Sequence, residues 1–329
     1  MTVSLVTGGA GFIGSHLVDA LLARGDRVLA LDDESTGSAE NLQAARAHPR
    51  FQFARGSAAD AALLASLLNQ ADEVYHLAAA VGVALVAREP VRSIETNILP
   101  TQVVLEAMRQ AAAAGKRQRL FFAGTSEVYG KNPRERWSET DDLVFGPTTK
   151  PRWSYGVSKA IDEFLVLGAV RSWGLPAVIG RFFNVVGPRQ SGAYGMVLPR
   201  FVDAALSGRP LLVHDDGTQI RCFAHVADIV PAVMNLVRAP QAVGEVFNIG
   251  SDQPVSIRRL AERVIAQCES PSPIEHQSYA AAYDADFEDI RCRIPDLTKI
   301  RQTLNYQPRY DLDAMIRDVI AWRRTPAAS

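Results

Sequence analysis

The sequence predicts an α/β protein: a doubly wound parallel sheet with a second, smaller α/β domain interleaved with it. Short apolar runs alternate with helical stretches through about residue 180, as in strand–helix–strand units. A glycine-rich turn joins the first apolar run to the first helical stretch. After Asn184 the chain changes to loops, proline, glycine and shorter elements, which indicates the second domain.

The expected strands follow one another along the first half of the chain. A helix from Ser15 to Ala23, ending near Gly25, separates the first two strands. Because parallel strands in such a sheet end at one edge, a ligand cleft is expected at their carboxyl ends. The predicted strands are 3–7, 27–31, 72–79, 119–124 and 175–181.

The turn after the first strand has the spacing of a dinucleotide fingerprint. Gly8 permits the tight turn, Gly11 lets the backbone approach a pyrophosphate, and Gly14 lets the helix pack on the strand. The helix N-terminus offers backbone amides to the anion. With strand, turn and helix in this order, the segment predicts a Rossmann domain.

Asp32 closes the second strand, where a carboxylate binds the hydroxyls of an adenosine ribose. A carboxylate there repels the 2′-phosphate of NADP. The sequence therefore favours NAD over NADP as the cofactor.

Tyr155 and Lys159 form a pair that indicates chemistry. Residues four apart share a face of a helix, so the Lys159 ammonium is expected beside the Tyr155 phenol. A neighbouring cation lowers the pKa of a phenol from about 10 towards neutrality. Tyr155 is therefore a candidate general base.

Composition points away from several other classes of protein. The chain of 329 residues has a formal net charge of −1 with interspersed signs, which argues against nucleic acid or a membrane surface as partner. The three cysteines have no C-x-x-C spacing, and His76, His214 and His225 have no metal-ligand spacing. We expect no metal site, no membrane span and a cytoplasmic location.

Six motifs in family order make the chain resemble the extended short-chain dehydrogenase/reductases, which include nucleotide-sugar epimerases, dehydratases and decarboxylases. The resemblance spans nearly the whole chain. The motifs are Gly8-x-x-Gly11-x-x-Gly14, Asp32, His76-Leu77-Ala78-Ala79, Thr125-Ser126-Glu127-Val128-Tyr129-Gly130, Tyr155-x-x-x-Lys159 and Arg181-Phe182-Phe183-Asn184-Val185-Val186-Gly187-Pro188.

The resemblance implies a role for each of these positions. Tyr155 takes the proton of the sugar C4 hydroxyl, Thr125 hydrogen-bonds that oxygen, and Lys159 binds the nicotinamide ribose. A 4-ketosugar results and is later reduced by the same NAD. The remaining residues expected along the cofactor are Phe12, Ile13, Ser57, Ala58, Leu77, Ala78 and Ala79.

The reaction that follows C4 oxidation is best predicted as decarboxylation of UDP-glucuronate. Ser126-Glu127, Lys150-Pro151-Arg152-Trp153 and Arg293-Ile294-Pro295-Asp296 resemble the UDP-glucuronate decarboxylases of the family. Glu127 would act through the sugar ring or a water. Arg293 would sit beside the carboxylate, protonate C5, or bind the diphosphate. Ser126 replaces the Asp of the 4,6-dehydratases, which argues against dehydration.

Two other functions stay open at this point. A UDP-sugar 4-epimerase, acting on a UDP-glucuronate or UDP-glucose type of substrate, needs only the C4 redox machinery. A catalytically idle NAD-binding protein is the remote alternative, and the joint presence of Thr125, Tyr155 and Lys159 argues against it.

The resemblance also predicts how substrate and partner bind. Residues 1–183 with approximately 218–240 are assigned to the NAD-binding domain, and 184–217 with 241–329 to the nucleotide-sugar domain. Family members commonly pair through two helices, so Ile94 to Ala114 and the Tyr155 helix are candidates for a homodimer interface. The residues expected to bind the nucleotide sugar are Asn184, Arg189, Val197, Arg221 and Arg293.

Overall fold

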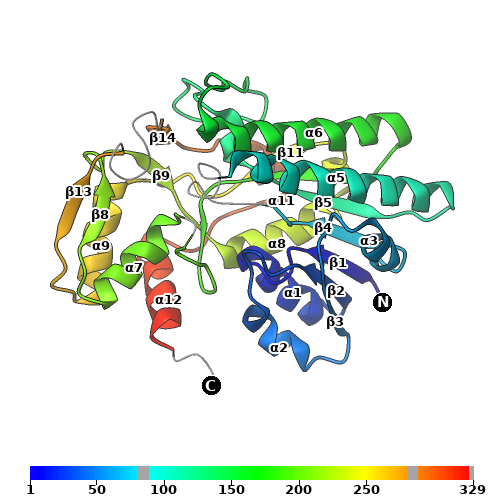
Figure 1. Cartoon of the computed structure of the whole chain (residues 1–329), viewed down its shortest axis with the longest axis horizontal. Coiled ribbons are helices and arrows are strands. Elements are labelled where there is room, and N and C mark those ends of the chain that lie inside the picture. Colours follow the sequence, from blue (N-terminus) through cyan, green and yellow to red (C-terminus); the bar gives the residue numbers. More distant parts are fainter. Residues whose placement is uncertain (80–88, 194, 280–287, 326–329) are drawn as a thin grey trace.

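A parallel sheet of seven strands forms the centre of the molecule (Figure 1). In this computed structural model, residues 1–79, 89–193, 195–279 and 288–325 are described. The strand order is β11-β6-β5-β4-β1-β2-β3, and every neighbouring pair is parallel, which confirms the predicted fold class. The strands are β1 (Val3–Thr7), β2 (Arg27–Asp32), β3 (Phe51–Arg55), β4 (Glu73–His76), β5 (Arg119–Thr125), β6 (Ala177–Phe182) and β11 (Val246–Ile249).

Helices cover both faces of this sheet. One face packs against α3 (Ala61–Leu68), α5 (Pro90–Ala113) and α6 (Ser154–Trp173). The other packs against α1 (Phe12–Arg24) and α8 (Val226–Leu236), with the shorter α2 (Gln43–Arg46) and α11 (Thr298–Leu304) beside them. Strands buried on both sides need apolar residues throughout, which is why their sequences are nearly continuous apolar runs.

The order of the strands reverses between β1 and β4. The chain moves outward from β1 through β2 to β3, then returns to place β4 on the other side of β1. At such a point the loops that follow the two strands diverge and leave a crevice. The glycine turn follows β1 at this crevice, so the sheet topology positions it for ligand binding.

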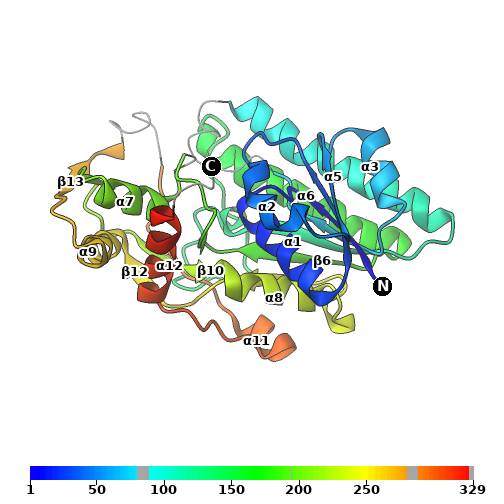
Figure 2. The same cartoon turned by 90° about the horizontal axis from the view of Figure 1, so that it is seen from below.

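A second layer of structure lies at one end of the molecule, where Figure 1 and Figure 2 both group α7, α9 and α12. These helices are α7 (Val197–Leu206), α9 (Ile257–Cys268) and α12 (Leu312–Arg324). They enclose a separate apolar core that includes Phe201 and Ile316. The parallel pair of β8 (Leu211–His214) and β13 (Ile274–Gln277) covers it on one side.

A three-stranded sheet and a two-stranded pair complete this second layer. In the order β12-β9-β14, β12 (Pro254–Ser256) is antiparallel to β9 (Ile220–Cys222), and β14 (Cys292–Arg293) is parallel to it. The register sets Arg293 directly opposite Arg221. The parallel pair of β7 (Val185–Val186) and β10 (Ala224–His225) lies where the chain passes between the large sheet and the second layer.

The predicted domain boundaries are wrong at two strands. β11 lies in 241–329, which was assigned to the nucleotide-sugar domain, yet it pairs with β6 at the edge of the large sheet. β9 lies in 218–240, which was assigned to the NAD-binding domain, yet it forms the middle of the three-stranded sheet. Short strands of similar composition can pair with either sheet, so sequence pattern did not separate them.

None of the helices in the described ranges is long and apolar enough to cross a membrane.

Candidate active site

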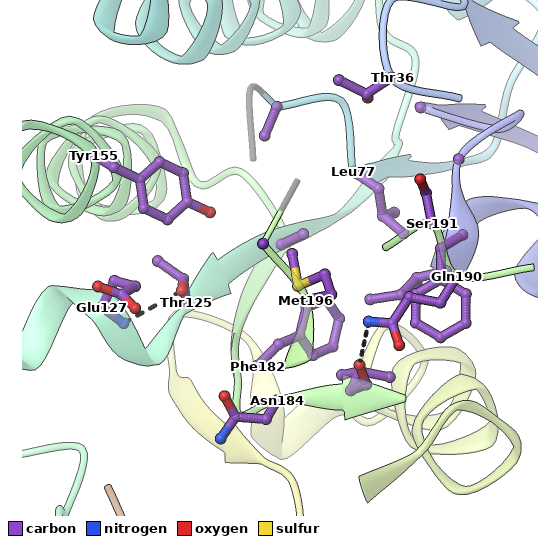
Figure 3. A pocket seen from close by; sticks show the side chains of 18 of the residues that line it. Thr36, Leu77, Thr125, Glu127, Tyr155, Phe182, Asn184, Gln190, Ser191 and Met196 are labelled. Carbon is purple, nitrogen blue, oxygen red and sulfur yellow. Dashed lines mark hydrogen bonds between the residues drawn. The ribbon is translucent and has the colours of Figure 1, made fainter. Parts of the chain in front are cut away.

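A pocket opens at the carboxyl ends of the central strands and extends to the second layer (Figure 3). Of the described residues predicted for the site, Lys159 and Arg189 alone do not line it. The predicted residues that do are Gly8, Gly11, Phe12, Ile13, Gly14, Asp32, Ser57, Ala58, Leu77, Ala78, Ala79, Thr125, Ser126, Glu127, Tyr155, Asn184, Val197, Arg221 and Arg293.

The glycine turn is built as its spacing predicts. Gly8 has a φ of +72°, in the left-handed region that only glycine adopts readily. A Cβ on Gly14 would lie 2.0 Å from the Gly8 carbonyl oxygen, so the start of α1 packs against the turn only without a side chain. Gly11 directly precedes α1 as its N-cap, and its backbone faces the pocket.

Asp32 supports the turn as well as facing the pocket. One carboxylate oxygen accepts a hydrogen bond of 2.9 Å from the Ala10 N–H, and the other accepts one of 2.7 Å from the Glu34 N–H. Burial raises the pKa of Asp32, while these two hydrogen bonds act to lower it. The side chain therefore fixes the turn to the end of β2.

The loops after β3 and β4 bring the residues predicted for the cofactor to the pocket. Leu77, Ala78 and Ala79 follow β4, and Ser57 and Ala58 follow β3. The Ala78 N–H donates to the Thr7 hydroxyl over 3.3 Å, which joins the loop after β4 to the end of β1.

Tyr155 lies at the first turn of α6, above Thr125 at the end of β5 (Figure 3). Burial raises the pKa of Tyr155 above its ordinary value, and the negative charge of Glu127 raises it further. A hydrogen bond with the Thr125 hydroxyl opposes this rise. Thr125 also accepts from the Glu127 N–H over 3.2 Å, which fixes the turn after β5.

Lys159 differs from the prediction. It does not line the pocket, and its ammonium lies 3.3 Å from Asp162 and 3.9 Å from the centroid of the Phe122 ring. Burial lowers the pKa of Lys159, and Asp162 acts to raise it. The expected lowering of the pKa of Tyr155 is wrong for this arrangement, because burial and Glu127 outweigh any effect of the ammonium on the phenol.

Glu127 lies between two arginines at the floor of the pocket. Its oxygens are 2.6 Å from an Arg152 nitrogen and 2.6 Å from an Arg293 nitrogen. Burial acts to raise the pKa of Glu127, but both guanidiniums more than offset it, so the pKa lies well below its usual range. An ionised carboxylate therefore sits close to Tyr155 and Ser126.

A second ion pair lines the pocket on β9, the strand that pairs with β14 of Arg293. Arg221 donates two hydrogen bonds to Asp289, of 3.1 and 3.0 Å, and Asp289 also accepts from the Tyr279 hydroxyl. Asn184 and Val197 line this region as predicted. Arg189 does not, because its guanidinium donates to Asp19 of α1 over 2.7 Å instead.

Arg152, Tyr279 and Asp289 are site residues that our prediction did not include. Arg152 stood in a quoted motif, 150–153, but no chemistry was attached to it. Tyr279 and Asp289 lie in a loop region whose sequence has no periodicity, so no local signal marks them.

A family model described as GDP-mannose 4,6 dehydratase matches residues 5–319. The chain belongs to the extended short-chain dehydrogenase/reductase family. It is 39% identical over 321 residues to a UDP-N-acetyl-alpha-D-glucosaminuronate decarboxylase of Bacillus cytotoxicus, covering 97% of each chain. It is 33% identical to UDP-glucuronic acid decarboxylase 1 of Arabidopsis thaliana, covering 94% of this chain and 66% of that enzyme.

Solved structures of this family have the same fold. A UDP-glucuronic acid 4-epimerase of Bacillus cereus, in complex with UDP-glucuronic acid and NAD, superposes with a TM-score of 0.87. The identity is 28%, and the match covers 97% of this chain and 98% of that one. A UDP-glucose 4-epimerase of Thermotoga maritima with UDP-glucose also has a TM-score of 0.87, at 28% identity and 98% coverage of both chains.

Proposed function

We propose that this family member is an NAD-dependent decarboxylase of a UDP-linked hexuronic acid, such as UDP-glucuronate. The observation that carries the proposal is the ion pair of Glu127 and Arg293 on the floor of the pocket, next to Tyr155 and Thr125. Arginine presents a planar fork that matches a carboxylate. The decarboxylase relatives, which span nearly the whole chain, support the same reaction.

The residues around the glycine turn fit NAD. Gly8, Gly11 and Gly14 leave the backbone open to a pyrophosphate, and Asp32 faces the same pocket as a ribose ligand. The wall 77–79 and the pair Ser57 and Ala58 would enclose the rest of the cofactor. When bound, NAD supplies a reversible two-electron oxidation at C4 of the sugar.

The chain's own residues divide the chemistry between two carbons of the sugar. In its ionised form Tyr155 would accept the proton of the C4 hydroxyl, while Thr125 donates a hydrogen bond to that oxygen. In the resulting β-keto acid the C5–C6 bond breaks, CO₂ leaves, and the electron pair moves into the ketone as an enolate. Protonation at C5 completes the step. Glu127 and Arg293 line the same pocket as Tyr155 and Thr125.

A UDP-sugar 4-epimerase is the second candidate function. Structures of such enzymes superpose over almost the whole chain, and a UDP-glucuronic acid 4-epimerase is among them. Epimerisation would use the same Tyr155 and Thr125 but would leave the carboxylate in place.

Product analysis separates the two reactions. The purified protein is incubated with NAD and either UDP-glucuronate or UDP-N-acetylglucosaminuronate, each labelled with carbon-13 at C6. We expect labelled CO₂ together with a UDP-pentose in the NMR spectrum of the sugar. A C4 epimer without CO₂ would instead make the protein an epimerase, and UDP-glucose serves as the control substrate that has no carboxylate to lose.

We propose further that the protein is a homodimer paired through α5 and α6. These helices pack side by side, and they expose large apolar side chains that soluble monomers rarely present together. On α6 the exposed positions recur at spacings of three and four residues, so they share one face. The exposed residues are Val91, Ile94 and Leu99 on α5, and Val157, Ile161 and Phe164 on α6.

A cytoplasmic location is part of the same proposal. Cys222, Cys268 and Cys292 are all free thiols, which fits a reducing compartment.

A further inference from the structure

A cluster of side chains outside the pocket holds the segment that leads to Arg293. Glu288 accepts a hydrogen bond of 3.0 Å from the indole N–H of Trp153. The same carboxylate oxygen lies 2.6 Å from the Lys131 ammonium, which in turn lies 5.3 Å from the centroid of the Trp153 ring. We call Lys131, Trp153 and Glu288 the indole cluster. None of these three residues lines the pocket.

Trp153 connects the indole cluster to the helix that carries Tyr155. It is the last residue of the short helix η3 (Pro151–Trp153), and α6 begins at the next residue with Tyr155 in its first turn. Trp153 is buried, and a Cβ on Gly146 would lie only 2.1 Å from its indole nitrogen. The indole is therefore held rigidly by its surroundings, with its N–H directed at Glu288.

Glu288 connects the indole cluster to the strand that carries Arg293. The segment that begins at Glu288 runs to β14, where Arg293 pairs with Glu127. On the way, Ile290 packs in the same apolar core as Trp153. Glu288 and Arg293 are the two ends of one short segment, so the position of the first limits the position of the second.

The hydrogen bond from Trp153 contributes more to this connection than the ion pair with Lys131. The side chains of Lys131 and Glu288 are 41% and 30% exposed, and ion pairs this open to water contribute little. A hydrogen bond from a buried N–H to a carboxylate is stronger, and loss of the acceptor removes a partner from a buried donor. The hydrogen bond from Lys131 lowers the pKa of Glu288, so the acceptor is an ionised carboxylate at neutral pH.

We propose that Glu288 is a positioning residue for Arg293. By accepting from Trp153 it fixes the start of the segment relative to α6, and Arg293 at the other end is thereby held in the same pocket as Tyr155. A shift of about 1 Å at such a group is enough to weaken its contacts with a ligand. The inference rests on the hexuronate substrate of the proposed function, because Arg293 is the residue proposed to meet that substrate.

The test compares affinity for the nucleotide sugar with affinity for NAD. The residues predicted for NAD lie on other segments, from β1 to the loop after β4, so a displaced Arg293 should weaken only the nucleotide sugar. UDP-glucuronate is titrated calorimetrically into the NAD-loaded protein in a Tyr155→Phe background, which lacks the proposed general base and does not consume the sugar. In Glu288→Ala the dissociation constant of UDP-glucuronate should rise about tenfold, while that of NAD stays unchanged.

Matched substitutions separate the parts of the contact. Glu288→Gln keeps an acceptor for the indole and should retain most of the affinity, and Lys131→Met should lose less than Glu288→Ala. Trp153→Phe removes the donor but keeps an aromatic ring, so adding Glu288→Ala to it should cause little further loss. The control is Glu245→Ala, which removes another partly exposed ion pair, of 2.7 Å to Lys299, and should keep both wild-type affinities.

An unchanged dissociation constant of UDP-glucuronate in Glu288→Ala would overturn the role of Glu288. An equal loss of affinity for NAD would overturn it too, because it would indicate general damage to the fold. Should Glu288→Ala not fold, as checked by circular dichroism, Trp153→Phe carries the same comparison.

The CO₂ assay above tests the reaction separately. Release of CO₂ by wild type, with no loss of affinity in Glu288→Ala, would remove only this inference. A selective loss of affinity without release of CO₂ by wild type would support the role of Glu288 and overturn decarboxylation. A protein that does not bind UDP-glucuronate at all would overturn both proposals.

Discussion

At the first turn of α6, Tyr155 is buried next to the negative charge of Glu127. Both conditions raise the pKa of its phenol, so the protonated form is the stable one in the absence of other charges. Thr125 opposes this effect by hydrogen bonding. Tyr155 is thus placed to exchange a proton with a hydroxyl held against Thr125.

We expect Tyr155→Phe to abolish most turnover while the fold survives. Loss of general acid–base catalysis lowers kcat by about 10² to 10⁴-fold. Kinetic assay of product formation, with circular dichroism to check the fold, measures both effects.

The matched control is Tyr306→Phe. Tyr306 is also buried, and its hydroxyl donates to the Gly250 carbonyl over 2.8 Å, outside the pocket. Its loss should lower stability by about 1 kcal/mol and leave kcat unchanged. Equal turnover in Tyr155→Phe and wild type would remove Tyr155 from the mechanism.

At the scale of elements, β1, its glycine turn and α1 form one unit. One glycine of the turn lets α1 pack against it, and another lets a ligand approach the backbone. Gly14 touches the Gly8 carbonyl, whereas a Cβ on Gly11 would meet only one backbone oxygen at 3.1 Å. Gly14 therefore limits how α1 packs, and Gly11 limits how close a ligand approaches.

Substitution by alanine should separate these two requirements. We expect Gly14→Ala to lower the free energy of unfolding by about 1–3 kcal/mol, because a Cβ 2.0 Å from a backbone oxygen forces the turn to shift. Gly11→Ala should lose NAD affinity with a smaller loss of stability. Urea unfolding measures the stability of both variants, and titration with NAD measures their affinity for the cofactor. Equal losses of stability in the two variants would contradict the separate roles of Gly14 and Gly11.

The exposed apolar face of α5 and α6 leads to a prediction about assembly. Phe164 is 71% exposed on this face, so Phe164→Glu should place charge in the proposed dimer interface and give a monomer at micromolar concentration. Val243→Glu, at a loop position that is 44% exposed, is the control and should stay dimeric. Light scattering measures the oligomeric state of each protein, and a monomeric wild type would rule out the dimer.

At the scale of the whole molecule, the ends of β1 and β4 are tied together by a buried histidine. The His76 ring is within 2.7 Å of the Thr7 hydroxyl and 3.4 Å of the Thr101 hydroxyl of α5. Burial and the charge of Lys159 lower the pKa of His76 to about 3. His76 is therefore neutral in the folded protein while the unfolded chain binds a proton below about pH 6.5.

Stability should fall as the solution is acidified. The unfolded state binds more protons than the folded state in this range, so the free energy of unfolding rises with pH and falls on acidification. For His76 the loss is about 2 kcal/mol between pH 7 and pH 5. Urea unfolding at several pH values should give a flatter profile in His76→Gln, and a slope equal to that of wild type would contradict this role of His76.

Local patterns predicted much of the fold and of the site. The glycine turn, Asp32 and Tyr155 were predicted from spacing, and Thr125 from the family resemblance; all of them line the pocket. Lys159 and Arg189, also predicted for the site, do not line the pocket, and their roles stay predictions. The Lys159 ammonium pairs with Asp162, three residues further along the same helix, and the Arg189 guanidinium pairs with Asp19 of α1, which lies far away in the sequence.

By itself, the sequence determined the parallel sheet, the glycine turn and the residues that project from it, since these depend on period and local backbone conformation. Tertiary structure decided which strand joined which sheet, as with β11. It also brought Arg152 and Arg293 to the two oxygens of Glu127. The physical reason is that ion pairing and burial act between segments far apart in the chain, and their partners are fixed only when the sheet and the second layer pack.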